Sequence, residues 1–254
     1  MKPVALIFAV CLVAACAQHG RSRHLVYIVD VTGSVTADAR AGAIAGLQQV
    51  FRILKRGDTV SVIPITDDSA VDAPTQTLRF ALSTKREPYD ADLRRVAHDA
   101  DAQLASLLAL AKTHPYGQTD LLGTFQLASE EFGEQAKIGD HALVCLSDFI
   151  QDDRQYDFKH DPRLTTPAKA KQLAGQLVQR GDKPLRGVHV YLGLLPSSDL
   201  RTLSQTRRDA IHVFWVEWLC AQGATVRWAT DGAGQVLTFL ESPADAVLAE
   251  STQE

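Results

Sequence analysis

The 254-residue sequence has no long basic run and no basic patch interleaved with aromatic side chains. Its formal net charge is −4, and only 7% of its residues are aromatic. Nucleic-acid-binding domains usually carry clustered positive charge, so we expect no nucleic-acid partner. Internal repeats and low-complexity segments are also missing, and 46% of the residues are apolar. This composition is typical of an ordinary globular protein, and its length suits one large α/β domain or two small ones.

The sequence also lacks the common catalytic histidine and nucleotide motifs. Its histidines are scattered and form no H-x-x-H or H-E-x-x-H pair, and no Walker A glycine-lysine loop is present. We therefore expect ordinary structural or surface roles for the histidines.

Cysteine is scarce, with four in the chain. Cys11 and Cys16 belong to the N-terminal segment discussed next. Cys145 lies in an apolar predicted strand and Cys220 in an apolar predicted helix. The alternatives for this pair are a disulfide and two free thiols, and free cysteine is the commoner state of buried residues of this kind.

Residues 1–15 are typical of a targeting segment. A short basic start precedes an apolar stretch, residues 3–13, that is too short to span a bilayer. The following VAAC, ending at Cys16, resembles a bacterial lipobox; the alternative is an ordinary secretory signal cut near Ala15. The resemblance implies a lipid on Cys16, a short linker over residues 16–23 and attachment to a membrane of the cell envelope. Because Ala17 is not aspartate, it also implies the periplasmic face of the outer membrane in a Gram-negative cell.

Strands and helices alternate over residues 24–240, and residues 241–254 resemble a solvated tail. Mostly continuous apolar strands separated by helices predict a doubly wound, mostly parallel six-stranded sheet with helices on both faces. The strand at 76–82 follows a short turn, so we expect it to be an antiparallel edge strand. The predicted strands are 24–30, 59–66, 76–82, 141–147, 187–194, 225–230 and a weaker one at 235–240. The predicted helices are 37–54, 92–112, one ending near 135, 167–180 and 198–221.

Two of these strands end on an aspartate, Asp30 and Asp148. With the common strand order 3-2-1-4-5-6, both carboxylates lie where the winding reverses, which is where ligands collect in such sheets. Thr32, Ser34 and the loop containing Thr119 flank the same crevice. Two facing carboxylates repel unless one is protonated or a cation lies between them.

An oxygen-only set of this kind suits Mg²⁺ or Mn²⁺ better than Zn²⁺. The alternative is that Asp30 and Asp148 cap the helices that follow them.

The pieces DVTGS (30–34), GQTD (117–120) and LSD (146–148) resemble the metal-ion-dependent adhesion site of von Willebrand factor A domains. The middle hydroxyl of the first motif is Thr32 here, where the family usually has serine. The resemblance implies coordination by Thr32, Ser34 and Thr119, with Asp30 and Asp148 acting directly or through water. It also implies that an acidic side chain of a partner protein completes the metal shell.

The polar insertion over 148–163 should rise from the same end of the sheet. It is interpreted as a partner-recognition loop, because binding residues concentrate on loops held by a rigid scaffold. A solvated loop without this role is the alternative. The recognition residues would be Asp152, Asp153, Tyr156, Asp157 and Phe158.

Three functions follow as hypotheses. The first is a lipid-anchored, non-enzymatic domain that binds a protein through a divalent metal. The second is a Mg²⁺-dependent hydrolase or phosphotransferase with Asp30 as nucleophile, although Thr32 stands where such enzymes have a second aspartate. The third is a metal-free structural scaffold.

Overall fold

The computed structural model describes residues 22–84, 89–113, 116–133, 140–178 and 183–242. The predicted signal segment, Cys16 and nearly all of the tail lie outside these residues, so their roles stay predictions. Within the described ranges, no helix is long and apolar enough to cross a membrane.

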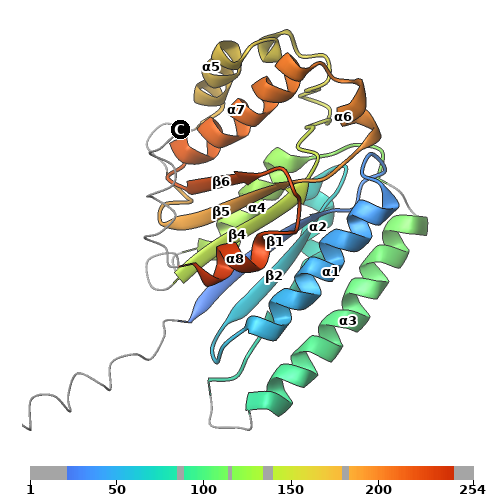
Figure 1. The fold of residues 1–254 in the computed structure, drawn as a ribbon, viewed down its shortest axis with the longest axis vertical. Helices are drawn as coiled ribbons and strands as arrows, with labels where there is room; N and C mark the ends of the chain where they lie inside the picture. The colour runs from blue at the N-terminus through green and yellow to red at the C-terminus, as the bar shows by residue number, and fades with distance from the viewer. Residues whose placement is uncertain (1–21, 85–88, 114–115, 134–139, 179–182, 243–254) are drawn as a thin grey trace, which may run out of the picture.

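The described chain forms a six-stranded sheet with the order β3-β2-β1-β4-β5-β6 (Figure 1). Every neighbouring pair is parallel except β2–β3, which is antiparallel. The predicted fold class is therefore confirmed, including the single antiparallel edge strand. The strands are β1 (Arg23–Asp30), β2 (Thr59–Ile65), β3 (Leu78–Ala81), β4 (Asp140–Ser147), β5 (Val188–Leu194) and β6 (Thr225–Ala229).

Helices cover both faces of the sheet, which explains why its central strands are apolar on both sides. In β1, for example, every residue from Leu25 to Asp30 is buried. One face packs against α1 (Ala37–Ile53), α3 (Tyr89–Thr113) and α8 (Val236–Glu241). The other packs against α2 (Ser69–Gln76), α4 (Leu121–Phe132) and α7 (Gln205–Ala221), and α5 (Pro167–Leu177) lies against α7 on the same side. The short α6 (Ser198–Thr202) precedes α7, and a 3₁₀ turn spans Pro162–Leu164.

Three predicted elements differ from the structure. The weak strand predicted at 235–240 is helix α8, whose Val236, Phe239 and Leu240 are buried at helical spacing. The region predicted as a turn before β3 contains helix α2, which has Pro74 inside it. The helix predicted at 198–221 is interrupted, because the Ser204 side chain accepts from the Arg207 N–H and caps a new helix, α7.

The segment that follows β4 is folded back on itself rather than extended into solvent. Asp152 pairs with Asp157 in a β-bridge. Phe158 is fully buried and packs against Phe214 and Trp215, with ring centroids 4.8 and 5.7 Å apart. The Phe158 side chain is therefore an anchor in the core and is not available to a partner's surface.

Two histidines lie side by side at the amino ends of β1 and β4. His24 and His141 are register partners, with ring centroids 6.2 Å apart, and Phe132 packs edge-on against both rings. Nδ1 of His24 and both ring nitrogens of His141 are buried without a hydrogen-bond partner. Burial and the neighbouring His141 lower the pKa of His24, while Glu131 opposes this shift.

Cys145 and Cys220 are both free.

We expect Phe158→Ala to lower the free energy of unfolding by about 3–5 kcal/mol, because it leaves a cavity in a close-packed core. Urea unfolding followed by fluorescence measures this change. The matched control is Arg154→Ala at an exposed position of the same segment, which should stay within about 0.5 kcal/mol of wild type. Equal stability of the two variants would contradict the anchoring role.

We expect His24 to reduce the stability of the protein as the pH falls below about 6.5, the unfolded pKa of histidine. The pKa of His24 is lower in the folded state, so the unfolded chain binds more protons there and the stabilisation that His24 contributes above this pH is lost in acid. Asp148, whose pKa is raised to about 7, acts in the opposite sense. The His24 contribution is therefore measured as the difference in unfolding temperature between His24→Phe and wild type, which should grow in favour of the variant from pH 8 to pH 5. The exposed His98→Gln is the control, and an unchanged slope in His24→Phe would refute the assignment.

Candidate metal centre

The five residues of the predicted metal site come together at the carboxyl ends of β1 and β4. Asp30 is the last residue of β1, and Asp148 directly follows β4. The two strands are hydrogen-bonded neighbours in the middle of the sheet, where the winding reverses. Thr32, Ser34 and Thr119 line a hollow of about 270 Å³. The two aspartates are buried, with exposed fractions of 0% and 1%.

The Asp30 carboxylate is fully hydrogen-bonded within the protein. Its Oδ1 accepts from the Thr32 N–H at 3.0 Å and from the Thr32 hydroxyl at 2.6 Å. Its Oδ2 accepts from the Ser147 hydroxyl at 2.6 Å. Burial raises the pKa of Asp30, while these hydrogen bonds and the positive charge of Arg40 lower it. Asp30 thus orients two hydroxyl groups.

The three predicted hydroxyl ligands form one cluster. The Thr32 hydroxyl donates its single proton to Asp30, so it can only accept from its neighbours. Ser34 Oγ lies 3.1 Å and Thr119 Oγ1 lies 3.4 Å from Thr32 Oγ1. Three neutral oxygens are therefore gathered beside the hollow, as the coordination of a hard cation requires.

Asp148 has the least satisfied polar atom of the site. Its Oδ1 accepts from the Ile150 N–H at 3.0 Å, but its Oδ2 is buried without a hydrogen-bond partner of normal geometry. Burial and, next, the charge of Asp30 raise the pKa of Asp148 to about 7, although the Ser197 and Ser34 hydroxyls lie close enough to oppose the rise. Buried acceptors without a hydrogen-bond partner are rare in folded proteins, so this oxygen is a candidate ligand for a cation.

The backbone beyond Asp148 is held in a strained conformation. Phe149 has φ +59°, and among the described residues it is the only non-glycine with a positive φ. Its N–H donates to Ser147 Oγ at 3.0 Å, and its carbonyl accepts from the Trp215 indole at 2.8 Å. The core helix α7 therefore fixes the direction in which the chain leaves β4.

Hydrogen bonds join the loops around the hollow. The Gly33 N–H donates to the Tyr116 carbonyl at 3.1 Å. Thr119 and Asp152 exchange two backbone hydrogen bonds, at 2.7 and 3.0 Å. The loop that carries Thr119 is thereby attached both to the first motif and to the insertion after β4.

Several residues around the site were not predicted. Lys159 lies at the hollow, where its Nζ is 2.8 Å from Asp152 Oδ2 and 3.1 Å from Asp199 Oδ2. Burial alone would lower the pKa of Lys159, but these two carboxylates raise it. Ser147 precedes Asp148 in the LSD motif, so the sequence held a signal for it. Ser197 comes from the β5–α6 connection and Asp199 from the first turn of α6, and neither belongs to a motif.

The donor set fits a hard divalent cation. In the described part of the chain, no three or more His, Cys, Asp or Glu side chains gather into a metal-binding group. A cation at the hollow would be held by the Asp148 carboxylate and the three hydroxyls, with Asp30 behind Thr32, and an oxygen-only set of this kind suits Mg²⁺ or Mn²⁺. The helix-cap alternative is wrong for Asp30, because Thr36 caps α1. It is wrong for Asp148 too, because the first helical turn after it is Pro162–Leu164.

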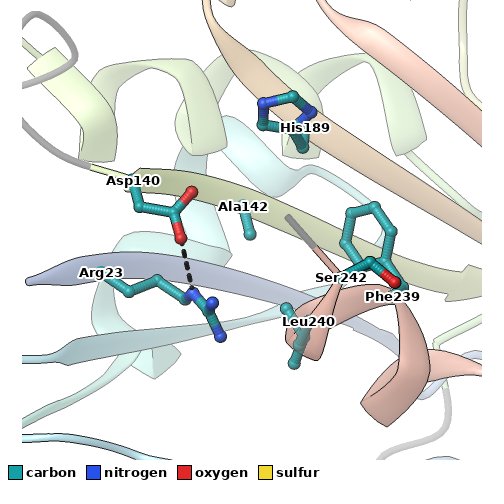
Figure 2. Close-up of a pocket in the computed structure, with 7 residues that line it drawn as sticks. All are labelled: Arg23, Asp140, Ala142, His189, Phe239, Leu240 and Ser242. Carbon is teal, nitrogen blue, oxygen red and sulfur yellow. Dashed lines mark hydrogen bonds and ion pairs between the residues drawn. The ribbon is translucent and has the colours of Figure 1, made fainter. Parts of the chain in front are cut away.

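A second hollow lies at the opposite end of the sheet. Figure 2 shows it beside the Arg23–Asp140 ion pair of 3.2 Å, with His189 on one side and Phe239 of α8 on the other. Its volume is only about 20 Å³, which holds roughly one water molecule. It is therefore not a candidate ligand site.

No protein-family model and no curated protein matches the chain. Among solved structures, it is similar to the manganese-loaded TRAP protein of Plasmodium vivax, with 13% identity over 87% of this chain and 72% of that one and a TM-score of 0.43. It is similar to a von Willebrand factor type A protein from Catenulispora acidiphila, with 14% identity, 87% and 42% coverage and a TM-score of 0.43.

The pilus adhesin SpaC from Lactobacillus rhamnosus GG gives 11% identity, 92% and 31% coverage and a TM-score of 0.47. The chain thus spans less than half of the length of the last two proteins. Its architecture is assigned from its own strand order and strand pairing.

Proposed function

We propose that this domain binds Mg²⁺ or Mn²⁺ at the carboxyl ends of β1 and β4 and uses the ion to hold an acidic group of a partner protein. The observation that supports this most directly is the buried, unpartnered Oδ2 of Asp148 beside a second carboxylate and three hydroxyls. Thr32, Ser34, Thr119 and Asp148 would hold the ion, and Asp30 would orient Thr32.

The bound ion would supply positive charge that attracts an anionic ligand. The protein's own part is to place neutral oxygens around it, so that much of its charge is left for the partner. Three residues that line the hollow, Gly33, Gly117 and Ser198, are exposed to solvent. Asp152 of the folded insertion lines this hollow, and Asp153, Tyr156 and Asp157 of the same insertion stay predicted recognition residues.

The geometry favours binding over catalysis by Asp30. A carboxylate nucleophile must reach its substrate, whereas Asp30 is buried and both of its oxygens accept hydrogen bonds. Thr32 donates a proton to Asp30 and so does not act as the general acid that a phosphotransferase needs. A metal-free scaffold is the second candidate, and the first experiment below separates the two.

We further propose that Cys16 anchors the protein to a membrane of the cell envelope through a lipid. The seven residues between Cys16 and His24 (17–23) reach at most about 25 Å when extended. The domain would then work close to the membrane surface, on a protein of the same envelope.

We expect Mg²⁺ or Mn²⁺ to raise the unfolding temperature relative to EDTA. An ion at a hundred times its Kd stabilises by about 2.7 kcal/mol, or roughly 5–10 °C for a domain of this size. Asp148→Asn should abolish the shift and, in EDTA, unfold at or above the wild-type temperature, because it removes a buried charge that faces Asp30.

Ser198→Ala is the matched control, because it removes a hydroxyl of the same hollow that is not a predicted ligand. It should keep the full shift, whereas Ser34→Ala should lose most of it. The absence of a shift in wild type at millimolar ion would favour the metal-free scaffold.

We expect the full chain expressed in a lipoprotein-processing bacterium to sediment with membranes. Cys16→Ser should release it to the soluble fraction and remove the lipid mass seen by mass spectrometry, whereas Cys220→Ser should behave as wild type. Equal membrane attachment of wild type and Cys16→Ser would exclude a lipid on Cys16.

A further inference from the structure

A second candidate binding site lies on the face of the sheet that α4 and α7 cover. A groove of about 710 Å³ runs along α4, between this helix and the ends of α5 and α7. Its volume is in the range of ordinary ligand sites. The groove extends from Asp120, which caps the start of α4, to Gly133 at its end. Twelve helical residues cover roughly 18 Å, so the groove is elongated.

Two residues that line the groove each contain a buried hydrogen-bond donor without a partner among the described residues. The donors are Trp218 Nε1 and Gln222 Nε2, which are one helical turn apart at the end of α7. Trp218 is only 8% exposed. The neighbouring Trp215, by contrast, donates its indole proton to the Phe149 carbonyl at 2.8 Å. Buried N–H groups without acceptors are rare in folded proteins, so a ligand that reaches these two would supply acceptors that no described residue provides.

The charged side chains that line the groove are all acidic among the described residues: Asp120, Glu130 and Asp153. Two of these carboxylates are occupied, since Asp120 accepts from Ser69 and Gly123 N–H groups and Asp153 accepts from two N–H groups of its own loop. Glu130 is exposed, and among the described residues it accepts one hydrogen bond, a long one of 3.4 Å from Gln126. The groove therefore presents unneutralised negative charge.

The remaining lining is partly apolar. Leu122, Leu177 and Tyr156 lie along it and are only partly buried. A ligand that fits this surface must combine hydrogen-bond acceptors, positive charge and aliphatic groups along about 18 Å. An extended peptide of five or six residues has this length, at about 3.3 Å per residue.

We propose that this groove binds an extended, basic segment of a partner protein. Main-chain carbonyls of the segment accept hydrogen bonds from Trp218 and Gln222, a lysine or arginine pairs with Glu130, and an aliphatic side chain packs on Leu177. The groove shares none of the predicted metal ligands, so this site operates with or without the ion.

The three tryptophans of the chain provide the test through their indole N–H signals in ¹⁵N-labelled protein. The probe is a blocked hexapeptide that alternates lysine and leucine, titrated to 2 mM. We expect a saturable downfield shift of the Trp218 indole proton, while the Trp215 signal, already hydrogen-bonded, stays in place. A blocked hexapeptide that alternates glutamate and leucine should leave both signals unchanged.

Single substitutions separate the contributions of the two hydrogen bonds and of the ion pair to peptide binding. Trp218→Phe and Gln222→Met should each weaken binding about fivefold, the loss expected for one hydrogen bond, measured from other backbone signals of the groove. Glu130→Gln should weaken it about threefold, as expected for an exposed ion pair. Glu217→Gln, an acidic position of α7 outside the groove, is the matched control. Asp148→Asn should bind the peptide as wild type does, so failure of the metal centre leaves this result intact.

Three outcomes would overturn the proposal. They are no saturable shift at 2 mM lysine-leucine peptide, equal shifts with the acidic peptide, and unchanged affinity in both Trp218→Phe and Gln222→Met. A Trp218 shift that depends on protein concentration without any peptide would replace the basic segment by a second copy of this chain.

Discussion

The parallel pairing of β1 with β4 is the constraint on which the rest of the structure depends. It joins segments more than a hundred residues apart in the chain, from Arg23↔Asp140 to Val29↔Leu146, and it places the reversal of winding at the centre of the sheet. The hydrogen bond of 2.6 Å from the Ser147 hydroxyl to Asp30 continues this strand pairing one residue beyond the last backbone pair. The candidate metal centre depends on this hydrogen bond, because it fixes the Asp30 carboxylate that orients Thr32.

The same strand pairing brings together two carboxylates, Asp30 and Asp148, that repel each other. Asp30 and Asp148 are both buried, and neither forms an ion pair within the described chain. The fold accommodates Asp30 with three hydrogen bonds but leaves one oxygen of Asp148 without a hydrogen bond of normal geometry from any described residue. This asymmetry distinguishes a carboxylate used for positioning from one left available to a ligand.

The sequence predicted those features of the structure that a local pattern of residues determines. Continuous apolar strands between amphipathic helices predicted the sheet, and strand-end aspartates followed by small hydroxyl residues predicted which oxygens meet. It was uninformative where the outcome depends on long-range packing. Helix α8 has only six residues, too few to separate a helical from a strand period, and α2 contains a proline. The insertion is polar in composition, so Phe158 gave no sign that α7 would bury it. Lys159 and Asp199 are forty residues apart, and only the fold shows that they meet.

The positive φ of Phe149 ties the metal centre to a helix that contributes no side chain to it. A non-glycine residue in this conformation costs about 1–2 kcal/mol, and the Trp215 indole is one of the groups that hold it there. The direction of Asp148 therefore depends on the docking of α7 against the segment that follows β4. Local opening of α7 would in turn release this carboxylate while the sheet is still intact. The position of Asp148 thus depends on the hydrophobic core beneath it. The candidate metal centre stays formed only as long as the helix that supports it stays docked.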